Sequence, residues 1–223
     1  MHGWIIILLI SLVSMFSGMA IAEYSWLILS KMEDIKFVKK NAFVCMTNTV
    51  VGLIDACLNI VIYWIYGLSI ESTIYMLAVI FLTAVSIIDW NSYEIPIQFN
   101  YVLLFLGIIR TLFDIGHWYI YIIGMFTVSG IFFLLALATK GRGMGGGDIK
   151  LMFTCGLILG WQKILLVMIM GSLLGAVIHS VIMRVSKKEH MLAFGPYLAT
   201  AVYITICCGQ PVIDWYLGQF KQY

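Results

Sequence analysis

Charged residues are scarce in this chain, since Asp, Glu, Lys and Arg make up only 11% of its 223 residues. A soluble domain of this size would carry about 25% charged residues and would be roughly half apolar. Here 62% of the residues are hydrophobic, which excludes an ordinary water-soluble domain. The net charge is only +2, so the composition predicts no nucleic-acid partner.

Patterns typical of metal sites are also missing. The five cysteines form no C-x-x-C pair, and no His/Cys spacing resembles a zinc site. Neither His179 nor His190 has a metal-binding partner at a familiar spacing. We therefore expect no bound metal and no structural role for metal coordination.

Long apolar runs fill most of the chain, whereas the alternating polarity of a membrane barrel is absent. The pattern predicts an all-α fold, a polytopic membrane helix bundle that forms a single domain over residues 1–223. About eight spans are expected, at 4–29, 43–67, 72–89, 99–113, 118–138, 149–160, 163–183 and 193–209. The segment 149–160 is too short to cross a typical bilayer alone, so seven spans, or a tilted or half-inserted helix, are the alternatives.

Basic residues are divided unequally between the predicted loops. With the N-terminus on the outer face, the loops at 30–42, 90–98, 139–150 and 184–192 are cytoplasmic and hold ten basic residues. These are Lys31, Lys36, Lys39, Lys40, Lys140, Arg142, Lys150, Arg184, Lys187 and Lys188. The outer segments keep only Lys163 and Lys221, and Arg110 lies inside a span near its outer end. Because cytoplasmic loops are enriched in Lys and Arg, both termini are predicted on the outer face.

Two aspartates stand at the ends of apolar spans. Asp89 ends the third span, and Asp148 follows the glycine-rich break at 143–147. Two spans separate them, an even number, so both should lie at the same, cytoplasmic face. Asp89 lies about 15 Å from the centre of its span, near the edge of the hydrocarbon core. The two carboxylates can therefore meet at one depth.

A pair of close carboxylates can hydrolyse a peptide bond, because the pair shares a proton. The ionised member takes a proton from water while the protonated member polarises the peptide carbonyl. The glycines at 145–147 would allow backbone angles closed to other residues and close approach of a substrate strand. Lys150 either holds Asp148 partly ionised or anchors the cytoplasmic end of its span. Taken singly, Asp148 could be only a helix cap and Asp89 an interfacial charge.

Three motifs resemble those of type IV prepilin peptidases and their archaeal preflagellin relatives. The string Gly145-x-Gly147-Asp148, with Lys150 after it, is similar to the G-x-G-D signature of that family. The placement of Asp89 seven residues before Pro96 resembles the family's first aspartate. A third stretch resembles the F-G-P-[FY]-L-A motif that opens the last helix in bacterial members: Phe194, Gly195, Pro196, Tyr197, Leu198 and Ala199.

The resemblance covers roughly residues 72–200 and implies a membrane aspartic endopeptidase with Asp89 and Asp148 as its catalytic pair. Residues 72–209 would form the catalytic core, and 1–67 would form N-terminal spans with a short cytoplasmic loop. The expected partners are the lipid bilayer and prepilin or pseudopilin precursors with a short basic leader, a glycine before the cut and an apolar helix after it. Cleavage would occur at the cytoplasmic face of the bacterial inner membrane, without a cofactor, in pilus assembly, protein secretion or DNA uptake.

One difference from the bifunctional bacterial members concerns the loop after the first span. Those enzymes carry a long cytoplasmic insert there, usually with two C-x-x-C pairs, and methylate the new N-terminus. Here the loop is the short segment 30–41, and it contains no cysteine. The resemblance therefore implies a short, peptidase-only form.

The main alternative is a small transporter or proton-coupled channel, in which intramembrane acids relay protons. Inverted repeats and mid-membrane broken helices would favour it, but the sequence shows no such repeat. An inactive assembly scaffold is disfavoured because both aspartates are present. Glu23 and Asp55 are left unassigned: each is either protonated and hydrogen-bonded between helices or part of a substrate groove.

Overall fold

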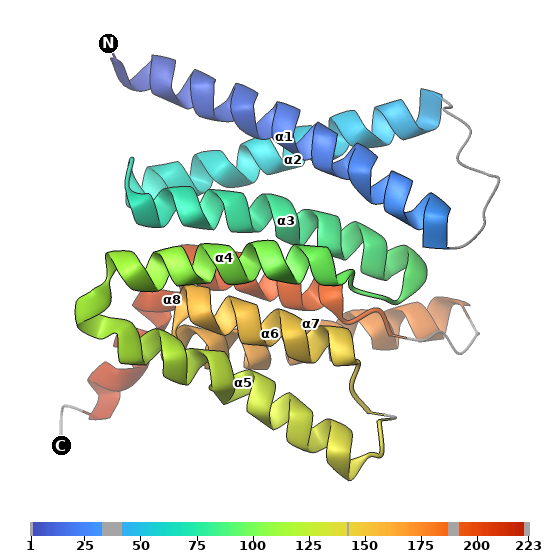
Figure 1. Cartoon of the computed structure of the whole chain (residues 1–223), viewed down its shortest axis with the longest axis vertical. Coiled ribbons are helices and arrows are strands. Elements are labelled where there is room, and N and C mark those ends of the chain that lie inside the picture. The colour runs from blue at the N-terminus through green and yellow to red at the C-terminus, as the bar shows by residue number, and fades with distance from the viewer. Residues whose placement is uncertain (1, 33–41, 142, 187–191, 221–223) are drawn as a thin grey trace. The chain divides into compact units, whose positions relative to one another are not determined.

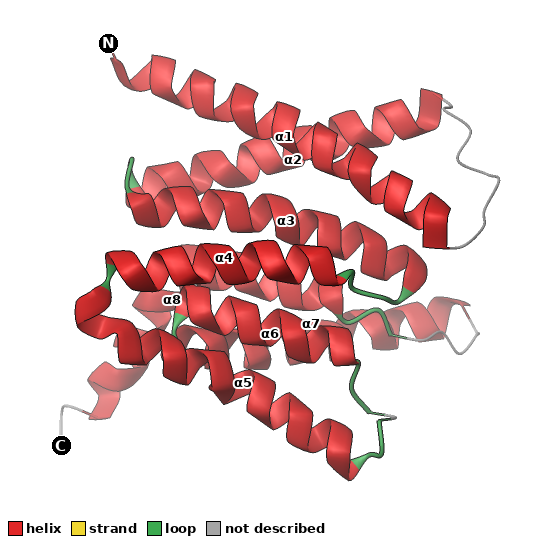
Figure 2. Cartoon of the chain, viewed as in Figure 1, coloured by secondary structure: helices red, strands yellow, loops and turns green. Residues whose placement is uncertain are grey.

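The computed structural model describes residues 2–32, 42–141, 143–186 and 192–220. Over these ranges the chain is helical, with short connecting loops and no strand (Figure 2). The helices are α1 (His2–Met32), α2 (Ala42–Tyr66), α3 (Ile70–Ser92), α4 (Ile97–Phe113), α5 (Trp118–Ala138), α6 (Gly146–Leu159), α7 (Trp161–Ser186) and α8 (Gly195–Phe220), with the 3-10 turn η1 (Ile115–His117) before α5. The predicted all-α, polytopic membrane bundle is confirmed.

Six stretches of the described helices are long and apolar enough to cross a membrane. They are Trp4–Lys31, Met46–Tyr66, Ile70–Ser92, Ile115–Ala138, Trp161–Ile182 and Gly195–Gln219. The two remaining helices are shorter: α4 has 17 residues and α6 has 14. At 1.5 Å per residue α6 extends about 21 Å, less than a hydrocarbon core of about 30 Å. The crossing of all eight helices and the outer position of both termini stay predictions.

The chain divides into two compact units, Met1–Glu94 and Ile95–Tyr223. In the first unit α1, α2 and α3 each contact the other two. In the second unit the short helix α6 contacts each of α4, α5, α7 and α8, so it lies at the centre of that unit (Figure 1). Its central position explains why α6 is apolar around its whole circumference, because nearly every residue from Leu151 to Leu159 is buried by neighbouring helices.

The position of α3 differs from the layout expected from the sequence. The expected core begins at residue 72, whereas α3 packs with α1 and α2 in the first unit. Whether the two units act as a single domain stays a prediction. The helix also extends beyond its expected end at Asp89 to Ser92, and it stops where Tyr93 adopts the left-handed conformation (φ 55°).

One other boundary was predicted wrongly from the sequence. The last helix, α8, continues through Pro211 to Phe220, although the expected span ended at 209. Proline removes one backbone donor and crowds the preceding turn, but membrane helices tolerate it within their span. The turn η1 lies between α4 and α5, in the gap between the expected spans 99–113 and 118–138.

Candidate active site

Asp148 lies in the first turn of α6, the central helix of the second unit. Gly145 is the N-cap residue with extended angles (φ −70°, ψ 138°), so Asp148 is the third residue of the helix. Its side chain is buried, with 9% of its surface exposed. The first turn of a helix carries unpaired N–H groups and the positive end of the helix dipole, both of which stabilise a carboxylate there.

Close contacts explain the spacing of glycines before Asp148. A methyl group at Gly145 would lie 2.9 Å from Asp148 Oδ2, and one at Gly147 would lie 3.1 Å from Ile95 Cβ. A methyl group at Gly146 would meet nothing within 4 Å. The two glycines of the G-x-G-D motif are thus the two positions without room for a side chain, and the variable position is the open one.

The predicted reason for the glycines needs correction. The sequence suggested backbone angles closed to other residues, but Gly145 is extended and Gly146 and Gly147 begin the helix α6. The described glycines with positive φ are Gly67, Gly141 and Gly160. Close approach of the Asp148 carboxylate and of Ile95, rather than special backbone angles, requires glycine at positions 145 and 147.

The start of α4 lies beside the start of α6 at one end of the second unit (Figure 1). Pro96 is the N-cap residue of α4 with φ −62° and ψ 133°, and its carbonyl accepts a hydrogen bond from the Phe99 N–H at 3.2 Å. A proline fits there because its backbone nitrogen needs no partner in the helix. Ile95, which precedes Pro96, is the residue that packs on Gly147. The start of α4, where Pro96 lies, is therefore next to Gly147 through Ile95.

Asp89 lies in the last turn of α3, in the first unit. Its side chain is 5% exposed, and its backbone carbonyl accepts the Tyr93 N–H at 2.9 Å, which closes the helix. Asp89 belongs to the first unit and Asp148 to the second. Their pairing in a dyad stays a prediction.

The third predicted motif begins α8. The Phe194 carbonyl accepts hydrogen bonds from the Tyr197 and Leu198 N–H groups, so Phe194 caps the helix, and Pro196 lies in the first turn, where proline is favoured. The Phe194 ring lies 6.1 Å from the Phe132 ring, and a methyl group at Gly175 would lie 3.1 Å from it. This motif, with Gly195 at the first helical position, fixes the start of α8 against α5 and α7.

Lys150 is exposed on α6, two residues after Asp148. Side chains at i and i+2 leave a helix on different sides, which favours an anchoring role at the membrane face over an ion pair with Asp148. Many of the basic residues that support the predicted topology lie outside the described residues: Lys36, Lys39, Lys40, Arg142, Lys187, Lys188 and Lys221. His190 also lies outside them.

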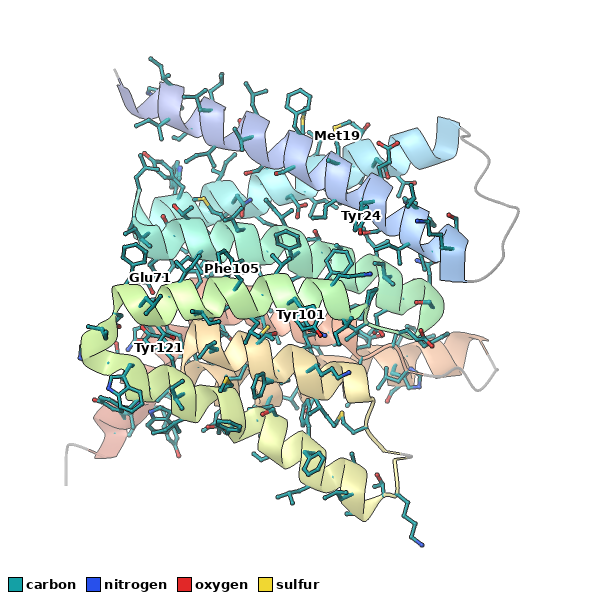
Figure 3. The ribbon with its side chains drawn as sticks, in the orientation of Figure 1. Met19, Tyr24, Glu71, Tyr101, Phe105 and Tyr121 are labelled. Atoms are coloured by element: carbon teal, nitrogen blue, oxygen red, sulfur yellow. The ribbon has the colours of Figure 1, made fainter. Side chains whose placement is uncertain are left out.

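A polar cluster that the sequence reading missed joins α4 to α5. Asp114 accepts hydrogen bonds from the Tyr121 hydroxyl (2.7 Å) and from His117 Nδ1 (2.8 Å). Arg110 Nη1 lies 4.0 Å from the same carboxylate, and its guanidinium lies 5.1 Å from the centre of the Tyr121 ring (labelled in Figure 3). The hydrogen bond from Tyr121, followed in size by the one from His117, holds the pKa of Asp114 below its ordinary value. In the sequence, the four-residue spacing of Arg110 and Asp114 is the signal that could have predicted this cluster.

This cluster lies at the opposite end of α4 from Pro96, and therefore away from the glycine motif. Among the described residues, no three His, Cys, Asp or Glu side chains come close enough together to hold a metal ion. Asp148, a buried aspartate in the first turn of the central helix α6, is the candidate site residue of the second unit. Ionisable residues in a membrane bundle are typical of functional sites.

Part of the chain matches a known protein family. The model of the type IV leader peptidase family matches residues 76–180, a range that includes Asp89, Pro96 and the G-x-G-D motif but ends before Phe194. Over these residues the chain is similar to the type IV leader peptidase family.

Similar proteins carry the name prepilin leader peptidase/N-methyltransferase. The protein from Pseudomonas putida is 32% identical over 166 residues, which cover 70% of this chain and 57% of that protein. The protein from Pseudomonas aeruginosa is 30% identical over 174 residues, covering 75% and 60%. The one from Legionella pneumophila is 26% identical over 175 residues, covering 75% and 61%. The matches thus span about six tenths of the relatives' length, and no solved structure matches the chain.

Proposed function

We propose that this protein is a membrane aspartic endopeptidase that removes the short basic leader from type IV prepilin-like precursors. The observation that carries the proposal is the fit of the G-x-G-D motif around Asp148. Its two glycines make room for the carboxylate and for Ile95, in a chain whose family relatives are named leader peptidases.

The second catalytic residue in this proposal is Asp89. Ile95 packs on Gly147, one residue before Asp148, and Ile95 follows Asp89 by only six positions along the chain. Six residues span at most about 20 Å when fully extended. Covalent connection thus keeps Asp89 within reach of the Asp148 region, which supports a dyad assembled from the two sides of the α3–α4 loop.

The helix positions of the two aspartates suggest different roles. Asp148 is in the first turn of α6 and Asp89 is in the last turn of α3. The helix dipole favours negative charge in a first turn and disfavours it in a last turn. We therefore assign Asp148 as the ionised base and Asp89 as the protonated acid.

In the resulting mechanism Asp148 takes a proton from water while the water oxygen bonds to the scissile carbonyl carbon. Asp89 gives its proton to the carbonyl oxygen, which forms a neutral tetrahedral intermediate. The C–N bond then breaks as Asp148 passes its proton to the leaving amine. Asp89 recovers a proton from the second hydroxyl of the intermediate, so the pair returns to its starting state.

The substrate and location follow from the same features. The relatives' names point to prepilin precursors, and the unequal distribution of basic residues supports cleavage at the cytoplasmic face of the bacterial inner membrane. The relatives are also named N-methyltransferases. We propose that this chain acts only as a peptidase, because the loop 30–41 is short and holds no cysteine.

The test is a cleavage assay in membranes that contain the protein and a pilin-type precursor. Asp89→Asn and Asp148→Asn should each reduce the cleavage rate at least 10³-fold, the order of a lost acid or base. Asp214→Asn removes an exposed carboxylate of α8 and should cleave like wild type. If both Asp89→Asn and Asp148→Asn still cleave, the aspartates are structural and the transporter alternative is favoured. Incorporation of a labelled methyl group into the product would contradict the peptidase-only form.

A further inference from the structure

A second aspartate-containing cluster is buried within the first unit, where α1, α2 and α3 meet. Asp55 and Asn59 of α2 are fully buried, Ser14 of α1 is 5% exposed, and Thr83 of α3 reaches the Asp55 carboxyl group. Asp55 is near the middle of the candidate span Met46–Tyr66. A charged side chain at that depth is strongly disfavoured in a bilayer.

Two glycines bring the helices close enough to enclose this carboxyl group. A methyl group at Gly18 of α1 would lie 2.5 Å from Asp55 Oδ2. A methyl group at Gly52 of α2 would lie 2.5 Å from the Met15 carbonyl and 2.6 Å from Met19 Cγ (Met19 is labelled on α1 in Figure 3). There is accordingly no room beside Asp55 for a larger side chain.

Two buried acceptors of this cluster receive no hydrogen bond. The Thr83 hydroxyl has a single hydrogen, and its Oγ1 lies 2.8 Å from the Ile80 carbonyl oxygen and 3.2 Å from Asp55 Oδ2. Asn59 Nδ2 donates to Ser14 Oγ at 3.0 Å. Asp55 Oδ1 and Asn59 Oδ1 are both buried acceptors without a hydrogen-bond partner. Buried polar groups normally have partners, so these two acceptors point to a missing donor.

No cation takes that place among the described residues of the first unit. The only lysine or arginine described there is Lys31, which is exposed at the end of α1. The groups that face Asp55 are the Thr83 hydroxyl from α3 and the Gly18 backbone from α1, and neither titrates. On α2 itself, Asn59 follows one turn later on the same face of the helix.

We propose that Asp55 is an intramembrane proton-binding site, whose neutral carboxylic acid donates its Oδ1 hydrogen to Asn59 Oδ1. One proton supplies the partner that both orphan acceptors lack, and it needs no additional space. The Thr83 hydroxyl then shares its hydrogen between Ile80 and Asp55 Oδ2. This bond network joins α1 and α2 to α3, the helix that also carries Asp89, and it does not depend on the proposed peptidase activity.

The experiment is infrared difference spectroscopy of the full-length protein in lipid nanodiscs, comparing wild type with Asp55→Asn at neutral pH. We expect the carbonyl stretch of a protonated carboxylic acid in wild type and its loss in Asp55→Asn. A carboxylate spectrum for Asp55 at neutral pH would overturn the proposal. Asn59→Ala, measured in the same way, should shift the frequency of the wild-type band, and an unchanged band would refute the Asn59 partner even if Asp55→Asn did not fold.

Thermal unfolding separates a proton from a metal ion at this site. Asp55→Asn replaces the acid by an amide that can still donate and accept, so its Tm should stay within a few degrees of wild type, while Asp55→Leu should unfold at a clearly lower temperature. The Tm of wild type should be the same in sodium, potassium and choline chloride at equal ionic strength. A Tm that rises with sodium alone, and not in Asp55→Asn, would identify a sodium site instead.

Discussion

The Gly145→Ala substitution tests whether the glycine motif positions Asp148. The backbone angles of Gly145 suit alanine, so the substitution introduces no backbone strain. Its methyl carbon would lie 2.9 Å from Asp148 Oδ2, whereas carbon and oxygen atoms normally approach to about 3.5 Å. The carboxylate must therefore move by at least roughly 0.5 Å, and a displacement of about 1 Å at a reacting group can lower a rate 10²-fold.

We therefore expect Gly145→Ala to lower kcat by about 10-fold to 100-fold, equivalent to about 1.4–2.7 kcal/mol of transition-state stabilisation. Gly147→Ala places its methyl 3.1 Å from Ile95 Cβ and should lower kcat through the α3–α4 loop, by a smaller factor. Gly146→Ala is the matched control, because a methyl there meets nothing within 4 Å. Alanine also favours the helix at that position by up to about 1 kcal/mol.

The assay measures initial cleavage rates of a pilin-type precursor at saturating substrate, with each variant adjusted to equal amounts in the membrane. The melting temperature of each purified variant separates a shifted carboxylate from an unfolded protein. If Gly145→Ala cleaves as fast as Gly146→Ala while Asp148→Asn is inactive, the close contact does not position Asp148 and the explanation of the motif is refuted.

Two further predictions concern stability. Gly124→Ala on α5 places a methyl 2.5 Å from the Gly156 carbonyl of α6 and should destabilise the second unit by about 1–3 kcal/mol. Gly130→Ala on the same helix is the control, because its methyl meets no atom within 4 Å and should have little effect. Equal melting temperatures of the two variants would contradict this packing. Because the pKa of Asp114 is lowered in the folded protein, its ionised form contributes stability above the ordinary carboxyl pKa of about 4, and this contribution is lost as the pH falls through the folded-state pKa. The difference in Tm between wild type and Asp114→Asn should be constant near neutral pH and shrink on acidification, and a difference that grows on acidification would contradict the assignment.

The sequence predicts the helices well because membrane helices need long apolar runs, which are visible without any tertiary information. Ends set by contacts or local caps are less visible. The extension of α3 to Ser92 depends on a left-handed Tyr93, a conformation that tyrosine rarely adopts. The continuation of α8 through Pro211 runs against the usual effect of proline.

In the candidate site, too, the sequence shows the polar motif residues but not the contacts that they make. The sequence identified Asp148 and its glycines, but it offered backbone freedom as the reason, because a string of letters does not show which neighbour fills the space beside each glycine. Ile95 was passed over for the same reason, since an isoleucine before a proline carries no chemical signal. Its contact with Gly147 becomes visible only when the starts of α4 and α6 are placed side by side.

Three buried aspartates, Asp55, Asp89 and Asp148, occupy three different positions along their helices, and position separates their roles. In the middle of a helix every backbone N–H is already bonded, so Asp55 must be satisfied by side chains, which favours a neutral acid. In a first turn, free N–H groups and the dipole stabilise the charge of Asp148. In a last turn, the carbonyl end disfavours charge at Asp89. Of these three aspartates, only the two near helix ends lie where a gap between helices can admit water and a substrate backbone. The proposed hydrolysis is therefore assigned to Asp89 and Asp148 rather than to Asp55.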